Sequence, residues 1–181
     1  MPARLELASL PDESLFELVQ KLDMAAFDEF YKRYERRLMA YCLAVLGDVE
    51  LAEDAYQTIM MKLFAARDRF TGGNLEAWIF TIARNTCLRA KEDRKRLTYI
   101  DGIDELPAEL TSGLDPSEHR VIHEAIRALP TVYREIIELR YFGEMSYDEL
   151  AVQLEITLDT VKVRLFRARK KLAEVLRPHF R

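Results

Sequence analysis

The chain has 181 residues, a length that suits one or two compact domains. Hydrophobic residues make up 49% and charged residues 32%, a composition typical of a globular protein and not of a disordered or fibrous one. No apolar stretch approaches the roughly 18 residues of a membrane span, and MPARLELASLPDESL lacks the apolar core of a signal peptide, so we expect a cytoplasmic protein. The net charge of −4 hides a basic C-terminal part, because residues 119–181 carry 12 basic and 9 acidic side chains. The acidic total therefore does not exclude nucleic acid as a partner.

Helical periodicity dominates the first part of the chain. Apolar residues recur at three- and four-residue steps over 27–45, and Gly47 is placed to end that helix. Two further stripes cover 51–64 and 75–87, separated by the turn signal at 71–74. No sustained strand alternation is present, which predicts an all-α bundle.

The periodic pattern fails between the two helical parts of the chain. Residues 97–118 are rich in glycine, proline and acidic side chains and carry no continuous apolar stripe. This composition predicts an acidic linker between a domain at 1–96 and a second domain at 119–181.

The second domain contains signals for several short helices. Pro130 starts one helix and Gly143 breaks it. Ser146 and Glu149 have the capping-box spacing for a short helix, and Asp159 is a suitable cap for a long final helix. Two helices joined by a tight turn predict a helix-turn-helix.

The final helix is strongly basic. No acidic residue lies between Thr160 and Ala173, and the segment carries six cations: Lys162, Arg164, Arg167, Arg169, Lys170 and Lys171. We interpret this helix as the one that enters a DNA major groove, with its first residues near the bases and its later cations on phosphates. The alternatives are a solvated basic face and a basic helix of the calmodulin-binding or membrane-surface kind.

A second basic cluster ends the last helix of the first domain. It consists of Arg84, Arg89, Lys91, Arg94, Lys95 and Arg96, and follows the turn residues Gly72, Gly73 and Asn74 and the single tryptophan, Trp78. Cations beside a flexible loop and an aromatic side chain suit unstacked, single-stranded bases. The competing interpretation of Trp78 is a core residue.

The sequence offers little for other chemistry. It contains no nucleophile–base set and no glycine-rich phosphate loop, so we expect neither an enzyme nor a small-molecule substrate or cofactor. His119 and His123 have a spacing that suits a metal, but no third ligand is close in sequence, so we expect no metal site. Cys42 and Cys87 are expected to be buried, reduced thiols.

Taken in order, these segments resemble RNA polymerase sigma factors of the extracytoplasmic-function (ECF) type, in the sigma-70 superfamily. The segment FDEFYKRYERRLMAYCLAVLGDVELAEDAYQTIMMKLF resembles the region that binds core polymerase. The family's minus-ten region is resembled by the segment FTGGNLEAWIFTIARNTCLRAKEDRKR. Its minus-thirty-five region is resembled by the segment ALPTVYREIIELRYFGEMSYDELAVQLEITLDTVKVRLFRARKKL. The resemblance implies a sigma region 2-like helical bundle followed by a sigma region 4-like helix-turn-helix.

The resemblance also implies roles for individual residues. Polymerase would dock on Glu53, Asp54 and Gln57. A base of the melted minus-ten element would meet Asn85, aided by the loop at 72–74, with Arg84 and Arg89 on the backbone. The recognition-helix positions are Asp159, Thr160, Lys162, Val163, Arg164 and Arg167. Val163 predicts an apolar base contact such as a thymine methyl, and Glu155 replaces the glycine usual in the turn.

We therefore predict a promoter-specificity subunit that binds core RNA polymerase and promoter DNA and initiates transcription of a stress or envelope regulon. The resemblance implies control by an anti-sigma factor. One alternative is a conventional helix-turn-helix regulator, which would dimerise and bind paired half-sites without polymerase. The other is a sigma-like adaptor that sequesters a partner protein.

Overall fold

The computed structural model describes residues 7–101 and 116–179, with side chains for 7–94 and 121–179. Within these residues the fold is all-α, as predicted. The N-terminal helices are α2 (Asp12–Gln20), α3 (Met24–Leu46), α4 (Val49–Ala66), the 3₁₀ turn η1 (Arg67–Arg69) and α5 (Leu75–Asp101). The C-terminal helices are α6 (Pro116–Ala128), α7 (Thr131–Ile137), the π-helical turn η2 (Glu138–Phe142), α8 (Tyr147–Gln153) and α9 (Leu158–Leu176).

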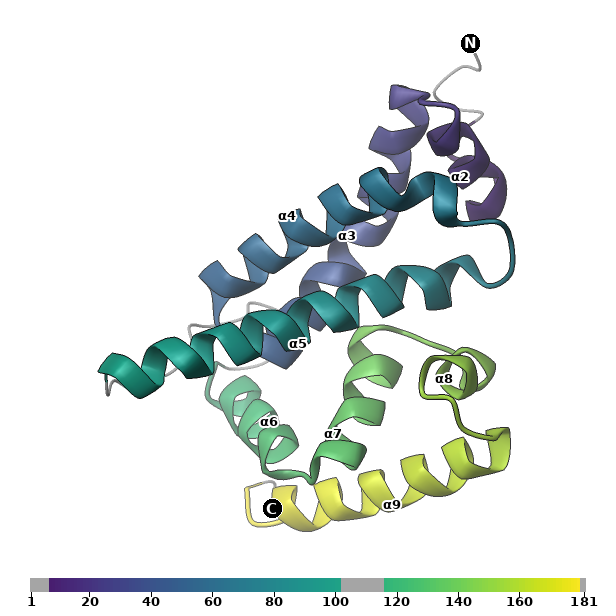
Figure 1. The fold of residues 1–181 in the computed structure, drawn as a ribbon. Coiled ribbons are helices and arrows are strands. Elements are labelled where there is room, and N and C mark those ends of the chain that lie inside the picture. The colour runs from purple at the N-terminus through teal and green to yellow at the C-terminus, as the bar shows by residue number, and fades with distance from the viewer. Residues whose placement is uncertain (1–6, 102–115, 180–181) are drawn as a thin grey trace.

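The helices form two layers that share one buried core. In Figure 1, α5 runs between α2–α4 on one side and α6–α9 on the other, with α9 on the outer edge of the C-terminal layer. The layers touch where α3 meets η2 and where α5 meets α8. The apolar cluster is continuous across this contact and includes Phe80 of α5, Leu139 of η2 and Met145.

Helix α2 completes the N-terminal bundle and was not predicted by the periodicity. It spans nine residues, too few for a clear stripe, yet it buries Leu15, Phe16 and Val19. The Phe16 ring packs against Phe30 at 5.2 Å and against Trp78 at 5.5 Å between ring centroids. Tertiary packing therefore stabilises a helix that its own length leaves marginal.

Both ends of α3 follow local chemistry. The Asp23 carboxylate starts α3 by accepting hydrogen bonds from the backbone N–H groups of Ala25 and Ala26, at 2.9 and 3.1 Å. Gly47 ends it in the left-handed conformation, with φ of 67°, which confirms the predicted stop.

Local signals in the C-terminal layer give one confirmed prediction and one correction. The Ser146–Glu149 capping box is present, with the backbone N–H of Ser146 donating to the Glu149 carboxylate at 2.6 Å. The cap of α9 is Thr157, so the prediction of Asp159 was wrong. Leu158 is already helical, which places the Thr157 hydroxyl 3.2 Å from the backbone nitrogen of Thr160. Asp159 instead lies in the first turn, where its charge favours the helix dipole.

The expected linker at 97–118 is helical at both ends, because α5 continues to Asp101 and α6 begins at Pro116. Its middle, 102–115, lies outside the described residues, as do the side chains of Lys95, Arg96 and His119. In the part of the chain that is described, no helix is both long and apolar enough to cross a membrane.

Candidate nucleic-acid interface

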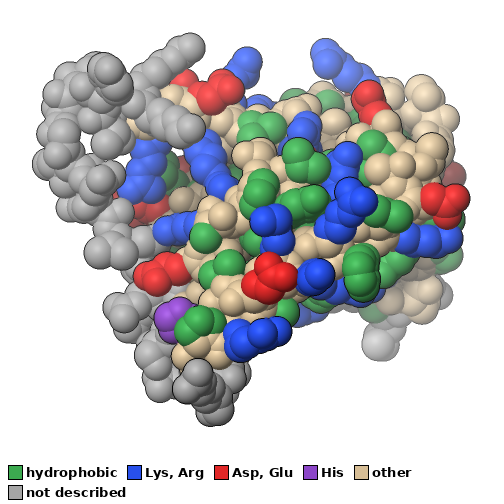
Figure 2. Space-filling model, turned by 90° about the horizontal axis from the view of Figure 1, so that it is seen from below, with side chains coloured by type: hydrophobic (Ala, Val, Ile, Leu, Met, Phe, Trp, Pro, Cys, Tyr) green, Lys and Arg blue, Asp and Glu red, His purple; other side chains and the backbone are tan. Residues whose placement is uncertain are grey.

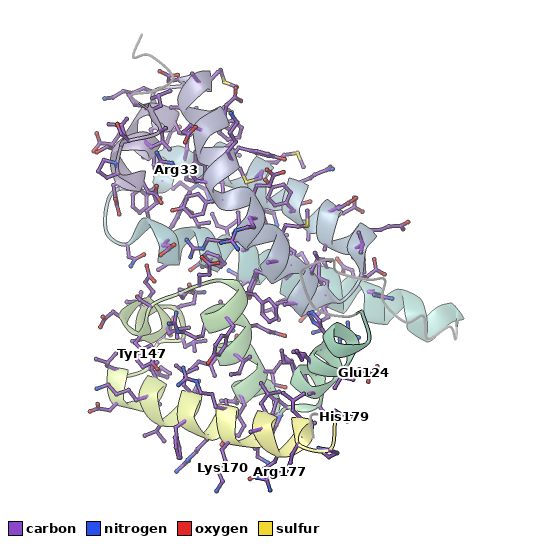
Figure 3. All side chains as sticks on the ribbon, turned by 180° about the vertical axis from the view of Figure 1, so that it is seen from behind. Arg33, Glu124, Tyr147, Lys170, Arg177 and His179 are labelled. Carbon is purple, nitrogen blue, oxygen red and sulfur yellow. The ribbon has the colours of Figure 1, made fainter. Side chains whose placement is uncertain are left out.

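Helix α9 separates an apolar inner side from a basic outer side. Val161, Leu165 and Ala168 are buried against the other C-terminal helices, at three- and four-residue steps. Viewed from below, the outer face carries Lys and Arg side chains interspersed with hydrophobic ones (Figure 2). Lys170 points away from the molecule on this side of α9 (Figure 3). The inner stripe therefore fixes which residues face solvent.

Most of the predicted minus-thirty-five residues lie on this outer side. The exposed ones are Asp159, Thr160, Lys162, Val163, Arg167, Arg169, Lys170 and Lys171. Arg164 is half-buried. Arg169 has internal partners, since its Nε donates to the Tyr141 hydroxyl at 2.7 Å. We infer that Arg169 stabilises the domain in this conformation as well as adding charge.

Phe166, which was not predicted as a site residue, lies in the same exposed surface. Its side chain is 67% exposed, and Val163, one turn earlier, is 48% exposed. A large apolar side chain so exposed between cations is unusual for a solvated helix face. The sequence contained a signal for this exposure, because Phe166 does not belong to the apolar stripe formed by residues 161, 165 and 168.

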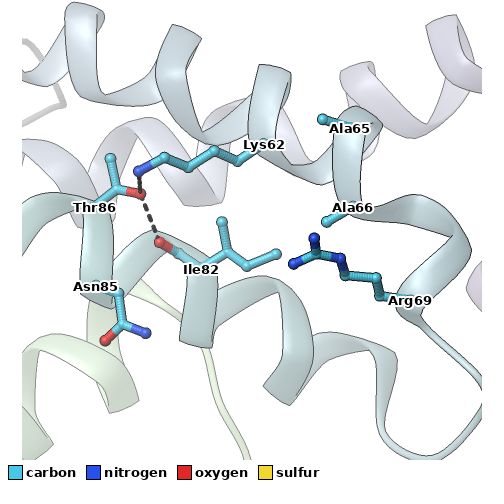
Figure 4. Close-up of a pocket in the computed structure, with 7 residues that line it drawn as sticks. All are labelled: Lys62, Ala65, Ala66, Arg69, Ile82, Asn85 and Thr86. Carbon is cyan, nitrogen blue, oxygen red and sulfur yellow. Dashed lines mark hydrogen bonds between the residues drawn. The ribbon is translucent and has the colours of Figure 1, made fainter.

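Asn85 lines a cleft between α4 and α5. The cleft has a volume of about 350 Å³ and is lined by Lys62, Ala65, Ala66, Arg69, Ile82, Asn85 and Thr86 (Figure 4). The Lys62 ammonium crosses from α4 to donate to the Thr86 hydroxyl at 3.0 Å, and that hydroxyl donates to the Ile82 carbonyl at 2.8 Å. Two cations, an amide and apolar walls together suit a base with its phosphate. Lys62 and Arg69 were not predicted as site residues, because they lie on α4 and η1, distant in sequence from Asn85.

The structure does not bring the 72–74 loop into this cleft. Gly72 and Gly73 have φ values of 115° and 98°, a conformation that suits glycine, and both are exposed. Asn74 starts α5, because its Oδ1 accepts from the backbone N–H of Ala77 at 2.7 Å. Asn85 lies eleven residues further along the helix, or about 16 Å at 1.5 Å per residue. Loop and cleft are thus separate parts of one surface.

The remaining minus-ten candidates differ in their surroundings. Trp78 is half-buried and packs against Phe16 and Phe70. These contacts favour the interpretation of Trp78 as a core residue. Arg84 forms an ion pair with Glu135 of α7 at 2.6 Å. Arg89 is exposed on α5, one turn beyond Asn85.

The predicted polymerase-binding residues share one side of α4. Glu53, Asp54 and Gln57 are exposed there. Gln57 also borders an apolar groove of about 410 Å³, whose other lining residues are Met24, Phe27, Tyr31, Tyr56, Met60, Met61 and Phe64. Met61 is 65% exposed. A polar side and a methionine-rich groove therefore form one continuous surface between α3 and α4.

Two further predictions concern sulfur and metal chemistry. Cys42 and Cys87 are buried and free, as expected, and the fold places their sulfur atoms 3.7 Å apart. Among the described residues, no group of three or more His, Cys, Asp or Glu side chains could hold a metal ion.

Comparison with known proteins assigns both domains. Residues 30–97 match Sigma-70 region 2, and residues 119–172 match Sigma-70 region 4. The ECF RNA polymerase sigma factor SigK of Mycobacterium tuberculosis is 30% identical over 175 residues, which cover 91% of this chain and 92% of SigK. The RNA polymerase sigma-H factor of Pseudomonas aeruginosa is 27% identical, over 94% of this chain and 96% of that protein.

A solved structure is similar as well. The sigma factor RpoE of Bartonella quintana, in complex with the anti-sigma factor NepR, superposes with a TM-score of 0.67 at 29% identity. The similarity covers 82% of this chain and 97% of that one. The chain belongs to the ECF sigma factors, which are transcription initiation factors and not enzymes.

Proposed function

We propose that this chain binds core RNA polymerase and directs it to promoters that have a minus-ten and a minus-thirty-five element. The observation that carries the proposal is the outer side of α9. There Asp159 sits at the helix start and pairs with Lys162 at 3.2 Å, and no acidic residue interrupts the sequence from Lys162 to Lys171. A helix of this kind, preceded by a short capped helix, fits the major groove and its phosphates.

The cleft at Asn85 is proposed to receive one unstacked base of the minus-ten element. The Asn85 amide has both a donor and an acceptor for a base edge, and the half-buried Ile82 gives an apolar wall. Lys62 and Arg69 lie where cations could hold the adjoining phosphates. Capture of the base would favour the melted over the paired strand.

Core polymerase is proposed to bind the surface between α3 and α4. Gln57 belongs both to the predicted polar side and to the apolar groove, so one partner covering the polar side would also reach the groove. Apolar grooves rimmed by polar residues are characteristic of protein interfaces. An anti-sigma factor would act by competing for this surface, and the related RpoE is found with such a partner. A stress or envelope regulon is the expected target.

The proposal is tested by run-off transcription with core polymerase on a promoter library, with and without the chain. We expect selective transcripts that share two spaced upstream elements. Asn85→Ala should lower the yield by roughly 5- to 150-fold, since about 1–3 kcal/mol accompanies each specific base contact. The matched control is Glu92→Ala, an exposed position two turns further along α5, which should leave the yield unchanged.

Other results would favour the alternatives. Binding to paired half-sites by a homodimer, without any binding to core polymerase, would establish a conventional regulator. Binding to core polymerase without any selective transcript would favour the adaptor. Equal loss of yield in the Asn85 and Glu92 variants would remove the cleft from the proposed minus-ten site.

A further inference from the structure

One lysine of α4 bridges the cleft that Asn85 lines. The Lys62 ammonium reaches the Thr86 hydroxyl of α5 and donates a hydrogen bond to it at 3.0 Å (Figure 4). The two residues lie 24 positions apart, so only the packing of α4 against α5 brings them together. Lys62 is otherwise exposed, and an exposed lysine ordinarily samples many side-chain conformations. The hydrogen bond therefore selects one position for its charge.

The Thr86 hydroxyl is fixed as an acceptor towards Lys62. A hydroxyl group has one hydrogen to donate and two lone pairs that accept. Thr86 is 5% exposed, and its hydroxyl donates that hydrogen to the Ile82 carbonyl, one turn earlier in α5, at 2.8 Å. Only its lone pairs remain for the ammonium. Helix α5 thus orients the group that holds Lys62.

Lys62 is held without being neutralised. Among the residues that the structure describes, no acidic side chain forms an ion pair with Lys62 or with Arg69, the other cation of the cleft. The neighbouring Arg67, by contrast, lies 3.6 Å from the Asp68 carboxylate. A carboxylate in place of the Thr86 hydroxyl would also hold Lys62, but it would cancel the charge. The hydroxyl leaves that charge and two further N–H donors for an anionic ligand.

We propose that Thr86 is a positioning residue for the minus-ten strand, which holds the Lys62 ammonium at the cleft, with its charge intact, for a phosphate of that strand. Immobilising a flexible side chain on binding costs free energy, so a lysine that is ordered beforehand binds more tightly than one that is not. The assignment of the phosphate to promoter DNA rests on the proposed function, whereas the ordering of Lys62 by Thr86 does not.

The fold does not depend on this hydrogen bond, which makes the role of Thr86 testable. Helices α4 and α5 share the apolar core through buried residues such as Ile59 and Ala83. Valine has nearly the same shape as threonine, and the Ile82 carbonyl keeps its helical bond to the backbone N–H of residue 86. The released ammonium can return to water, because Lys62 is exposed. Thr86→Val should therefore keep the Tm of the parent chain.

Trace labelling of lysines with acetic anhydride tests the contact in the full chain without any DNA. An ammonium held by a hydrogen bond reacts more slowly than a free one, and Lys21, exposed after α2, is the internal reference. Mass spectrometry should show Lys62 labelling, relative to Lys21, rising severalfold in Thr86→Val. Thr86→Ser keeps the hydroxyl and should keep the parent value. Equal labelling of Lys62 in all three chains would overturn the proposal.

Binding of single-stranded DNA tests the consequence of the contact. The probe is a fluorescent, random-sequence oligodeoxynucleotide, followed by anisotropy with the full chain bound to core polymerase, and core polymerase alone gives the background. Thr86→Val should weaken binding roughly 2- to 12-fold, the range for immobilising one flexible side chain. Thr86→Ser should restore the parent affinity.

The salt dependence separates positioning from loss of charge. Each phosphate contact to a single strand contributes about 0.7 to the slope of log affinity against log salt concentration. Lys62→Met removes the cation and should lower the slope by about 0.7. Thr86→Val keeps the cation, so it should lower the affinity and leave the slope unchanged. A general structural defect would not produce this difference.

A double-mutant cycle assigns the effect to Lys62. Thr86→Val should have no further effect in a Lys62→Met chain, because the side chain that it orders is gone. Arg69→Met is the matched control, since Arg69 lines the same cleft without a hydrogen bond to Thr86. In the Arg69→Met chain, Thr86→Val should keep its full effect.

Two failures are distinguishable. If Lys62→Met weakens binding but Thr86→Val does not, or if Thr86→Val acts equally with and without Lys62, the positioning role is overturned and the cleft remains a DNA site. If neither Lys62→Met nor Arg69→Met weakens binding, the cleft is not part of the DNA interface. The proposed function then loses its minus-ten site together with the role of Thr86.

Discussion

The Arg84 guanidinium of α5 lies 2.6 Å from the Glu135 carboxylate of α7, joining the two domains of the chain. Both side chains are partly shielded, at 32% and 25% exposed. Arg84 is also a residue that resemblance to sigma factors assigns to the DNA backbone. In this conformation one side chain therefore has two competing acidic partners, a carboxylate of its own chain and a phosphate.

The first prediction concerns the strength of this pair. In a double-mutant cycle with Arg84→Ala and Glu135→Ala, urea unfolding should give a coupling free energy of about 0.5–1 kcal/mol, since the pair is only partly buried. High salt should reduce the coupling by screening. Strictly additive effects of the two substitutions would mean that the pair contributes nothing to domain contact.

The second prediction concerns the recognition helix. Arg167→Ala should weaken binding to a duplex minus-thirty-five element by about 1–3 kcal/mol, the range for a specific contact to a base. Arg177→Ala is the control, because this exposed arginine lies just beyond the end of α9. The measurement is fluorescence anisotropy of labelled promoter DNA in the presence of core polymerase. Similar losses in both variants would indicate general electrostatic attraction instead of sequence reading.

The third prediction concerns backbone strain at Glu155. This residue has φ of 52°, the left-handed region that favours glycine, and occupies the turn position where sigma factors usually have glycine. Glu155→Gly should raise the free energy of unfolding by about 1 kcal/mol and Tm by about 3 °C.

The matched control for the Glu155 variant is a glycine substitution that should lower the free energy of unfolding instead of raising it. Glu35→Gly, at an exposed position inside α3, should lower the free energy of unfolding by about 1 kcal/mol. Thermal unfolding followed by circular dichroism distinguishes the two variants. A loss of stability in the Glu155 variant would show that its side chain contributes more than the strain costs.

The fourth prediction concerns the two cysteines. The hydrogen bond with Cys87, together with burial, raises the pKa of the Cys42 thiol, so the reactive thiolate is scarce. A chromogenic disulfide reagent should therefore find no reactive thiol in the native chain at pH 8 and two after unfolding in guanidinium chloride. Reaction of either thiol at the rate of a free peptide cysteine would contradict this burial.

Much of the local structure was predictable because its causes lie within a few residues. The stripe of Val161, Leu165 and Ala168 placed the buried side of α9, and Gly47 ended α3 as expected. The Ser146–Glu149 capping box depends on a four-residue pattern that the sequence displays directly. The cap of α9 was misplaced by two residues because threonine and aspartate are both good caps, and only the backbone shows which one precedes the helix.

The sequence by itself determined the helical class, the basic helix-turn-helix and the resemblance to sigma factors, since periodicity, capping and motif spacing are local patterns. Only the tertiary structure decided that Cys42 meets Cys87, that Lys62 and Arg69 join Asn85, and that Arg37 meets Glu76. These pairs come from helices distant in sequence, and their meeting depends on how the apolar faces pack. The same packing decides whether Arg84 is free for DNA or paired with Glu135, because burial and neighbouring charge are properties of the folded chain.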